Sequence, residues 1–214
     1  MGQGLIMGRI RNKLNDIVRP WINGRNRKKL KNHDFSLIAS NCNGGFILHD
    51  LGMRFNSPFV NLWMKPNEYI KMLTDLKGYM AEDLSFVKED GVDYPVGLLK
   101  DVHIYFQHYD SEEKAKQKWD TRKDRINYDN LFVLFTDQEE CTKADLEQFD
   151  RLPLDKKVVF TNKPYSEFNS VYYIKGFEHL ESVGNCFDFE ENYIGKKYYD
   201  QFDYVSWFNK ELEL

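Results

Sequence analysis

The sequence contains few cysteines, few prolines and no long apolar run, and each shortage excludes a class of protein. Its three cysteines lie far apart in 214 residues and form no Cys-x-x-Cys pair. This excludes a disulfide framework and a cysteine zinc site, and it is typical of a reducing compartment. No run of about 18 apolar residues can span a membrane, and the N-terminus lacks the apolar core of a secretory signal. With 42% hydrophobic residues and only 6 prolines, the chain is not of a disordered type. We expect a folded, cytoplasmic protein.

Several motifs of well-known enzymes are also missing. The chain has neither the G-x-G-x-x-G pattern of dinucleotide sites nor the Lys-Ser/Thr pair of phosphate-binding loops. It contains no Asp-x-Asp, the motif that metal-dependent glycosyltransferases usually show. The nearest approximation is Asp188-Phe189-Glu190. His103 and His108 are five residues apart on an expected strand, which places them on opposite faces and argues against a shared metal. A sugar transferase would therefore be metal-independent, with cationic side chains stabilising the leaving diphosphate.

Acidic residues are almost missing from the first 31 positions, which hold nine Lys or Arg against Asp16 alone. A net charge of +8 in this segment leaves −12 on the other 183 residues, within a total of −4. Such asymmetry is typical of a basic segment with an anionic partner, whereas the acidic remainder argues against nucleic acid as a partner. We therefore divide the chain into a basic N-terminal arm, residues 1–31, and a single α/β domain, residues 32–214.

Apolar residues recur in the arm at three- and four-residue steps, at Ile6, Ile10, Leu14, Ile17, Val18 and Trp21. The spacing predicts one apolar stripe on a helix that ends at Pro20 and Asn23-Gly24. In one interpretation the stripe enters a membrane interface while Lys and Arg bind anionic lipid, at the inner face of the membrane. In the other, the helix docks onto its own acidic domain or onto a partner protein.

Apolar runs and helical patterns alternate along the remaining chain. The runs predict strands at 35–39, 102–106, 130–135, 157–160 and 171–174, and helices at 46–51, 66–80, 111–126 and 143–149. Near-continuous apolar strands linked by helices favour parallel pairing and burial on both faces. We predict a three-layer α/β/α sandwich with a mainly parallel, or mixed, sheet, preceded by the basic amphipathic helix.

Folds of this kind bind ligands beyond the carboxyl ends of their strands. Those ends carry polar residues at 40–45, 107–111, 136–137 and 161–163. The best local signal is the turn Ser40-Asn41-Cys42-Asn43-Gly44-Gly45, because glycines between a strand and a helix let backbone N–H groups approach phosphate oxygens. A tight turn with a purely structural role explains the two glycines equally well.

Two candidates for catalysis lie at these strand ends. Cys42 is a possible nucleophile, since a helix N-terminus favours the thiolate, although a buried inert cysteine is the commoner outcome. His108 is a candidate general base, because the nearby Asp110 can orient and charge its imidazole. A strand-end histidine without a catalytic role is the alternative.

A cationic cluster is expected on the helix after Ser111. Lys118, Arg122 and Arg125 follow at steps of four and three residues and therefore share one face. Arginine forks suit a diphosphate, and Trp119 could stack on a ligand or pack in the core. A solvated helix face is the alternative.

Several separated motifs resemble one bacterial family. They are the turn at 40–45, Ser57-Pro58-Phe59-Val60-Asn61-Leu62, Tyr94-Pro95-Val96-Gly97, His108-Tyr109, Trp119 with Arg122, Arg125 and Ile126, and the run 157–161. In this order, over residues 33–208, they resemble the exopolysaccharide or capsule biosynthesis proteins, a domain of unknown function. The resemblance implies an α/β/α fold and a role in surface-polysaccharide synthesis, and it implies no mechanism.

The leading hypothesis is a glycosyltransferase-like, metal-independent enzyme of exopolysaccharide or capsule biosynthesis. It would bind a nucleotide sugar or another phosphorylated ligand, with its site formed by Asn41, Gly44, Gly45, His108, Arg122 and Arg125. One alternative is a non-catalytic scaffold that residues 1–31 hold at the membrane. Another is a hydrolase or acyltransferase that depends on Cys42 or Ser40. The sequence identifies no cofactor.

Overall fold

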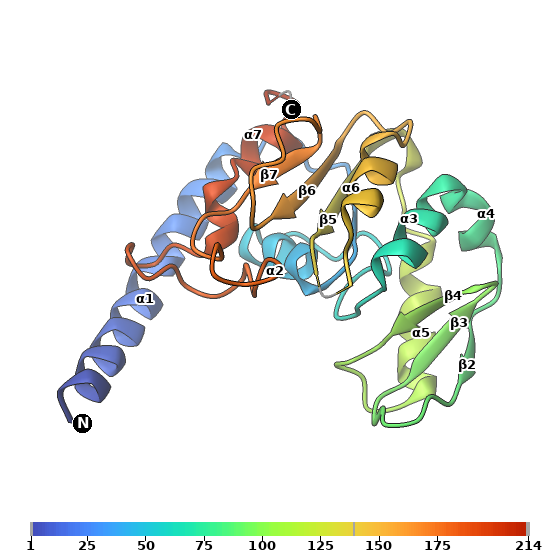
Figure 1. The fold of residues 1–214 in the computed structure, drawn as a ribbon, viewed down its shortest axis with the longest axis horizontal. Helices are drawn as coiled ribbons and strands as arrows, with labels where there is room; N and C mark the ends of the chain where they lie inside the picture. The colour runs from blue at the N-terminus through green and yellow to red at the C-terminus, as the bar shows by residue number, and fades with distance from the viewer. Residues whose placement is uncertain (1, 139, 213–214) are drawn as a thin grey trace.

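The central element of the fold is a parallel four-stranded sheet. The computed structural model describes residues 2–138 and 140–212. Strands β1 (Ser36–Ala39), β5 (Leu131–Thr136), β6 (Lys157–Thr161) and β7 (Val171–Tyr173) lie in the order β1-β5-β6-β7, and every neighbouring pair is parallel (Figure 1). The carboxyl ends of the four strands therefore meet along one edge of the sheet.

Helices cover both faces of this sheet. Alternate strand residues such as Leu37, Leu134 and Phe160 pack on one face with α2 (Cys42–Asp50) and α7 (Tyr204–Phe208). Their neighbours, Ile38, Val133 and Val159 among them, pack on the other face with α3 (Pro66–Thr74) and α6 (Lys143–Asp150). Burial on both faces explains why the strands are near-continuous apolar runs. The predicted three-layer α/β/α sandwich is confirmed.

A second, antiparallel sheet corrects one expectation. Strands β2 (Ser85–Val87), β3 (Val96–Leu99) and β4 (Val102–Tyr105) form a separate meander beside the main sheet (Figure 1). We expected the strand at 102–106 to join the parallel sheet. It pairs instead with the strand just before it, across the two residues Lys100 and Asp101, because so short a link permits only antiparallel pairing.

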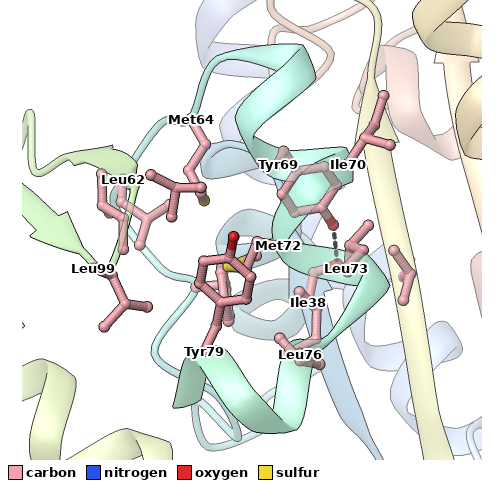
Figure 2. Close-up of a cluster of buried hydrophobic side chains, with 14 of the residues drawn as sticks. Ile38, Leu62, Met64, Tyr69, Ile70, Met72, Leu73, Leu76, Tyr79 and Leu99 are labelled. Carbon is pink, nitrogen blue, oxygen red and sulfur yellow. Dashed lines mark hydrogen bonds between the residues drawn. The ribbon is translucent and has the colours of Figure 1, made fainter. Parts of the chain in front are cut away.

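Two short helices join the sheets. The helix expected at 66–80 is divided at Asp75, which has φ −146° and caps α4 (Leu76–Ala81) by accepting a hydrogen bond from Gly78 N. Figure 2 shows side chains of α3 and α4 packed between Ile38 of the main sheet and Leu99 of the meander. The Tyr69 hydroxyl donates to Ile38 O at 3.0 Å. This cluster fixes the meander against the core. Helix α5 (Glu112–Lys123), capped by Ser111 as expected, follows the meander.

The basic arm forms one long helix, α1 (Gly2–Lys29), whose N-terminal end projects beyond the body (Figure 1). The prediction that Pro20 and Asn23-Gly24 end this helix is wrong, because the helix continues through both. A proline inside a helix costs about 3 kcal/mol, and buried contacts on either side of it offset that cost. Along the part of the chain that the structure describes, no helix combines the length and apolar character needed to cross a membrane.

Those buried contacts are polar and ionic. Arg19, with a side chain 8% exposed, forms ion pairs with Asp50 at 2.6 Å and with Asp200. The Asn23 side-chain amide also donates to Asp50, at 3.0 Å. Burial by itself raises the pKa of Asp50, but the Tyr199 hydroxyl and the Arg19 and Lys197 charges outweigh it and lower the pKa to about 2. The network anchors the second half of α1 to the body.

The two faces of α1 are inverted relative to those of a core-packed helix. The buried side chains that the structure describes in α1 are polar: Asn15, Arg19 and Asn23. The apolar stripe points to solvent, where Ile10 is 53%, Ile17 63% and Trp21 79% exposed. Val18 of the predicted stripe is half-buried against Gly195, whereas Ile10, Leu14, Ile17 and Trp21 do not dock onto the domain; the side chain of Ile6 lies outside the described ones.

Candidate functional site

Buried polar residues gather where three neighbouring strands end. Ser40 follows β1, Thr136 and Asp137 lie at the end of β5, and Thr161 and Asn162 lie at the end of β6. Each of these five side chains belongs to a residue no more than 5% exposed. Buried polar groups need partners, so a cluster of this kind has a structural or chemical reason.

Hydrogen bonds join the first two strand ends. The Ser40 hydroxyl accepts from Thr136 N at 3.2 Å, and the Asn43 amide donates to the Thr136 hydroxyl at 3.2 Å. Asn41 caps α2 by accepting from Asn43 N at 3.0 Å, and its oxygen also accepts from the Thr136 hydroxyl. These bonds fix the side chains before any ligand arrives.

Asp137 is the titratable group of this cluster. Burial raises its pKa to about 6, although the Cys141 thiol, the Lys163 charge and the Asn162 backbone N–H all act to lower it. A carboxyl group that titrates near neutral pH can exchange protons with a substrate, which is why such shifts are frequent at functional sites. Asp137 is therefore the best candidate for a general acid or base in the described residues.

Two buried amide oxygens of this cluster have spare hydrogen-bonding capacity. Asn43 Oδ1 and Asn162 Oδ1 are buried and accept no hydrogen bond from the residues that the structure describes. A buried acceptor without a donor costs about 1–3 kcal/mol. Hydroxyl groups of a ligand are suitable donors for both oxygens.

The glycines of the 40–45 turn have a packing role. A Cβ on Gly44 would lie 2.4 Å from the Ala39 Cβ, and one on Gly45 would lie 3.2 Å from Val60. Gly44 thus allows α2 to contact β1 closely, and this explains it without a phosphate. The turn remains part of the site through Ser40, Asn41 and Asn43.

The thiol of Cys42 is held in its protonated form, which is a poor nucleophile. Burial raises the pKa of its thiol, and Sγ lies 3.9 Å from Leu62 O. His49, which follows seven residues later, has a side chain 76% exposed and lies beside Asp50. A protonated thiol of this kind favours the inert interpretation over the cysteine hydrolase.

The expected pair of His108 and Asp110 is not formed. Both residues are exposed in the turn that follows β4, the last strand of the antiparallel sheet, and lie outside the parallel sheet. The Asp110 carboxylate binds Lys114 at 2.6 Å, four residues later on the same surface. The expectation that Asp110 orients the imidazole is therefore corrected.

Trp119 and the two arginines lie apart from the strand ends. Trp119 is 1% exposed and packs edge-on against Phe59 and Phe106, so it belongs to the core and cannot stack on a ligand. Arg125 donates to Phe55 O at 2.9 Å and, through its carbonyl, contacts Ser36, at the amino end of β1. The shared ligand expected for Arg125 and the 40–45 turn is thus contradicted.

Arg122 lies closer to the turn than Arg125 does. Its guanidinium donates to the Tyr109 hydroxyl at 2.8 Å, and that hydroxyl in turn lies 3.4 Å from Val60 O, next to Gly45. Arg122 is therefore linked to the turn through Tyr109 and Val60. Within residues 2–138 and 140–212, no three His, Cys, Asp or Glu side chains are grouped as metal ligands would be.

Sequence reasoning placed the loops 136–137 and 161–163 at the site edge but did not select Asp137 or Asn162. The sequence feature that indicates these two residues is their position directly after a buried apolar strand. The fold and this edge define an α/β/α protein with a buried polar cluster at the carboxyl ends of parallel strands.

Comparison with known proteins supplies the family. Residues 13–209 match the family described as Domain of unknown function (DUF1919), and the chain belongs to it. The match begins inside α1, twenty residues before the start expected from the motifs. An uncharacterized protein of Haemophilus influenzae is 47% identical over 201 residues, covering 94% of this chain and 97% of its own length.

Proposed function

We propose that the protein is a metal-independent, glycosyltransferase-like enzyme of bacterial surface-polysaccharide assembly, with Asp137 as its general base. The observation that supports the proposal is the buried Asp137 carboxyl, whose burial raises its pKa to about 6 at the edge where α/β folds bind ligands. The polysaccharide setting comes from the sequence motifs that resemble the exopolysaccharide and capsule proteins.

The proposed step transfers a sugar from an activated donor, such as a nucleotide sugar, to a hydroxyl group. Asp137 takes the proton of the acceptor hydroxyl while the oxygen bonds to the anomeric carbon, and the diphosphate leaves with the electron pair of the broken bond. A base with a pKa near the working pH is the efficient one for this step. Lys163, whose charge acts on Asp137, supplies positive charge at the same edge.

The neighbouring amides support a polyhydroxylated substrate. Asn43 Oδ1 and Asn162 Oδ1 are buried acceptors without donors among the described residues, and sugar hydroxyls would supply those donors. A site that hydrogen-bonds a hydroxyl strongly rejects analogues that lack it. We therefore expect deoxy-sugars to be poor substrates.

The test is turnover with a panel of nucleotide sugars and defined oligosaccharide acceptors. Asp137→Asn should reduce kcat at least about 100-fold, the range of a lost general base. Asp129→Asn, which removes an exposed carboxylate outside the site, is the matched control. Absence of turnover with every donor, or equal rates for Asp137→Asn and the wild type, would reject the proposal.

A second candidate function is attachment to an anionic membrane through α1, as a scaffold or to locate the enzyme. The exposed stripe of Ile10, Leu14, Ile17 and Trp21 favours it. The basic residues Arg25 and Lys28 lie beside Trp21, together with Pro20. Each Lys or Arg near an anionic surface contributes about 1 kcal/mol to binding. An apolar stripe with basic flanks is typical of interfacial helices.

Flotation with phosphatidylglycerol-containing vesicles tests this attachment. Ile17→Asp should release the full-length protein into the soluble fraction, whereas Asn12→Asp adds the same charge at an exposed position outside the stripe and should remain bound. Wild-type protein that stays soluble would reject the membrane role. Substitution is better than deletion of residues 1–31, because deletion also removes the buried Arg19.

A further inference from the structure

A groove of about 740 Å³ lies beside β7, outside the cluster at the strand ends. Residues 172–180, from β7 and the loop after it, form one wall, and residues 190–201 form the other. The volume is that of a small-molecule site, about 300–1,000 Å³. The groove contains none of the site residues predicted from the sequence.

Aromatic side chains dominate the apolar part of the lining: Tyr172, Tyr173, Phe177, Tyr193 and Tyr198. An aromatic ring has an electron-rich face. The C–H groups on one side of a pyranose ring carry partial positive charge, so a sugar stacks on such a face while its hydroxyls point sideways. Several tyrosines along one groove therefore suit consecutive sugar rings.

The polar part of the lining has the matching hydrogen-bonding groups. Glu190, 7% exposed, receives a hydrogen bond from Gln201, and burial raises the pKa of Glu190. Glu191 and Asn192 follow on the same wall. A carboxylate accepts hydrogen bonds from hydroxyl groups, and an amide both accepts and donates them. Lys175 and Lys196 share this lining with Glu190 and Glu191, while Asp200 is already paired with Arg19.

The groove is preformed. Gly176 has φ +105°, and a Cβ there would lie 2.6 Å from the Tyr198 ring, so glycine allows this wall to pack. Gln201 and Lys175 exchange two hydrogen bonds, at 2.9 and 3.0 Å, across the groove walls. A ligand therefore does not have to order these segments.

The groove is also tied to the proposed base. The Asn162 amide donates to Leu180 O at 2.6 Å, and Leu180 lies on the groove wall. The backbone N–H of the same Asn162 donates to Asp137. One buried residue thus links the groove wall with the carboxyl that would activate an acceptor.

We infer that this groove binds a neutral oligosaccharide chain, as the acceptor of the transfer. The role of the oligosaccharide as acceptor rests on the proposed function. The class of ligand rests on the aromatic and carboxylate side chains that line the groove. Sugar rings stack on the tyrosines, and their hydroxyls bind Glu190, Glu191 and Asn192.

The binding test uses neutral hexose and N-acetylhexosamine oligomers of two to six units, measured by saturation-transfer NMR and calorimetry on the full-length protein. Tyr193→Ala, at a residue 55% exposed, should weaken binding about fivefold without unfolding the protein. Glu191→Gln, which is isosteric, should weaken it as well. Trp21→Ala, an exposed aromatic outside the groove, should leave the affinity unchanged.

Two results would overturn the inference: no oligomer binds, or an oligomer binds with the same affinity to Tyr193→Ala and the wild type. Binding of uridine diphosphate that Tyr193→Ala abolishes would also overturn it, because the groove would then hold the donor. Failure of the proposed function is separate. Groove-dependent binding without any turnover rejects the transferase, whereas Asp137-dependent turnover with an acceptor KM unchanged in Tyr193→Ala rejects the groove.

Discussion

Replacing Asp137 by asparagine should stabilise the fold at neutral and alkaline pH. Burial raises the pKa of this carboxyl from 3.8 to about 6. The unfolded chain therefore loses the proton at a lower pH than the folded one, and stability falls as pH rises from about 4 to about 6. At about 1.4 kcal/mol per pKa unit, ionised Asp137 costs the wild type about 3 kcal/mol above pH 7. Asparagine carries no charge and avoids this cost.

Urea denaturation at pH 4 and pH 8, followed by tryptophan fluorescence, measures the effect. The difference in unfolding free energy between Asp137→Asn and the wild type should grow by about 2–3 kcal/mol in favour of the variant between these pH values. Any packing change caused by asparagine is the same at both pH values and cancels. Asp129→Asn controls for the loss of one surface carboxylate. A difference that does not change with pH would refute the reasoning about burial.

Three further predictions concern the arm, the turn and the cysteine. Arg19→Met should cost about 3–5 kcal/mol in urea denaturation, because two buried aspartates lose their ion pairs; a cost below 1 kcal/mol, equal to that of the exposed Arg25→Ala, would contradict the anchoring role. Gly44→Ala should lower stability by about 1–3 kcal/mol, since its Cβ would overlap Ala39 of β1. Gly24→Ala, with open space in the same chain, should raise stability by up to about 1 kcal/mol; the reverse order of melting temperatures would refute the packing argument. Cys42 should react with iodoacetamide more slowly at pH 7 than a free thiol, because burial raises its pKa. Fast labelling that is lost in Cys42→Ala would instead support a hydrolase that depends on Cys42.

The layered fold could be predicted because the signals for it are local. Apolar runs at β1, β5 and β6 and the helices between them determine parallel, doubly covered strands. Strand β4 has the same composition, but its partner is chosen by the two-residue link at Lys100-Asp101. The composition of a strand does not predict which strand it pairs with, whereas the length of the connecting loop does.

The arm shows how tertiary contacts override a local signal. Pro20 and Gly24 are reasonable helix ends by propensity. Arg19 and Asn23 on either side of the proline bind the same Asp50, and this buried pairing holds the helix through the break. Asp50 is far from the arm in the sequence, so no local sequence pattern predicts this pairing.

The sequence predicted which strand ends meet at one edge, but not which of their side chains are buried there. The turn at 40–45 and the loops after β5 and β6 do meet at one edge, as parallel strands require. Asp137 was not singled out, because its raised pKa depends on burial by residues distant in sequence. His108 was selected for the nearby Asp110, although Lys114, four residues further on, was the better partner for that carboxylate.

Burial raises the pKa of Asp137 to about 6, which makes it a base suited to neutral pH. The direct measurement is a carbon-13 NMR titration of the aspartate carboxyl groups, with the Asp137 resonance assigned by its loss in Asp137→Asn. We predict a midpoint of about 6 for Asp137. A midpoint near 3.8, the ordinary value for an aspartate, would show that burial does not raise the pKa of Asp137.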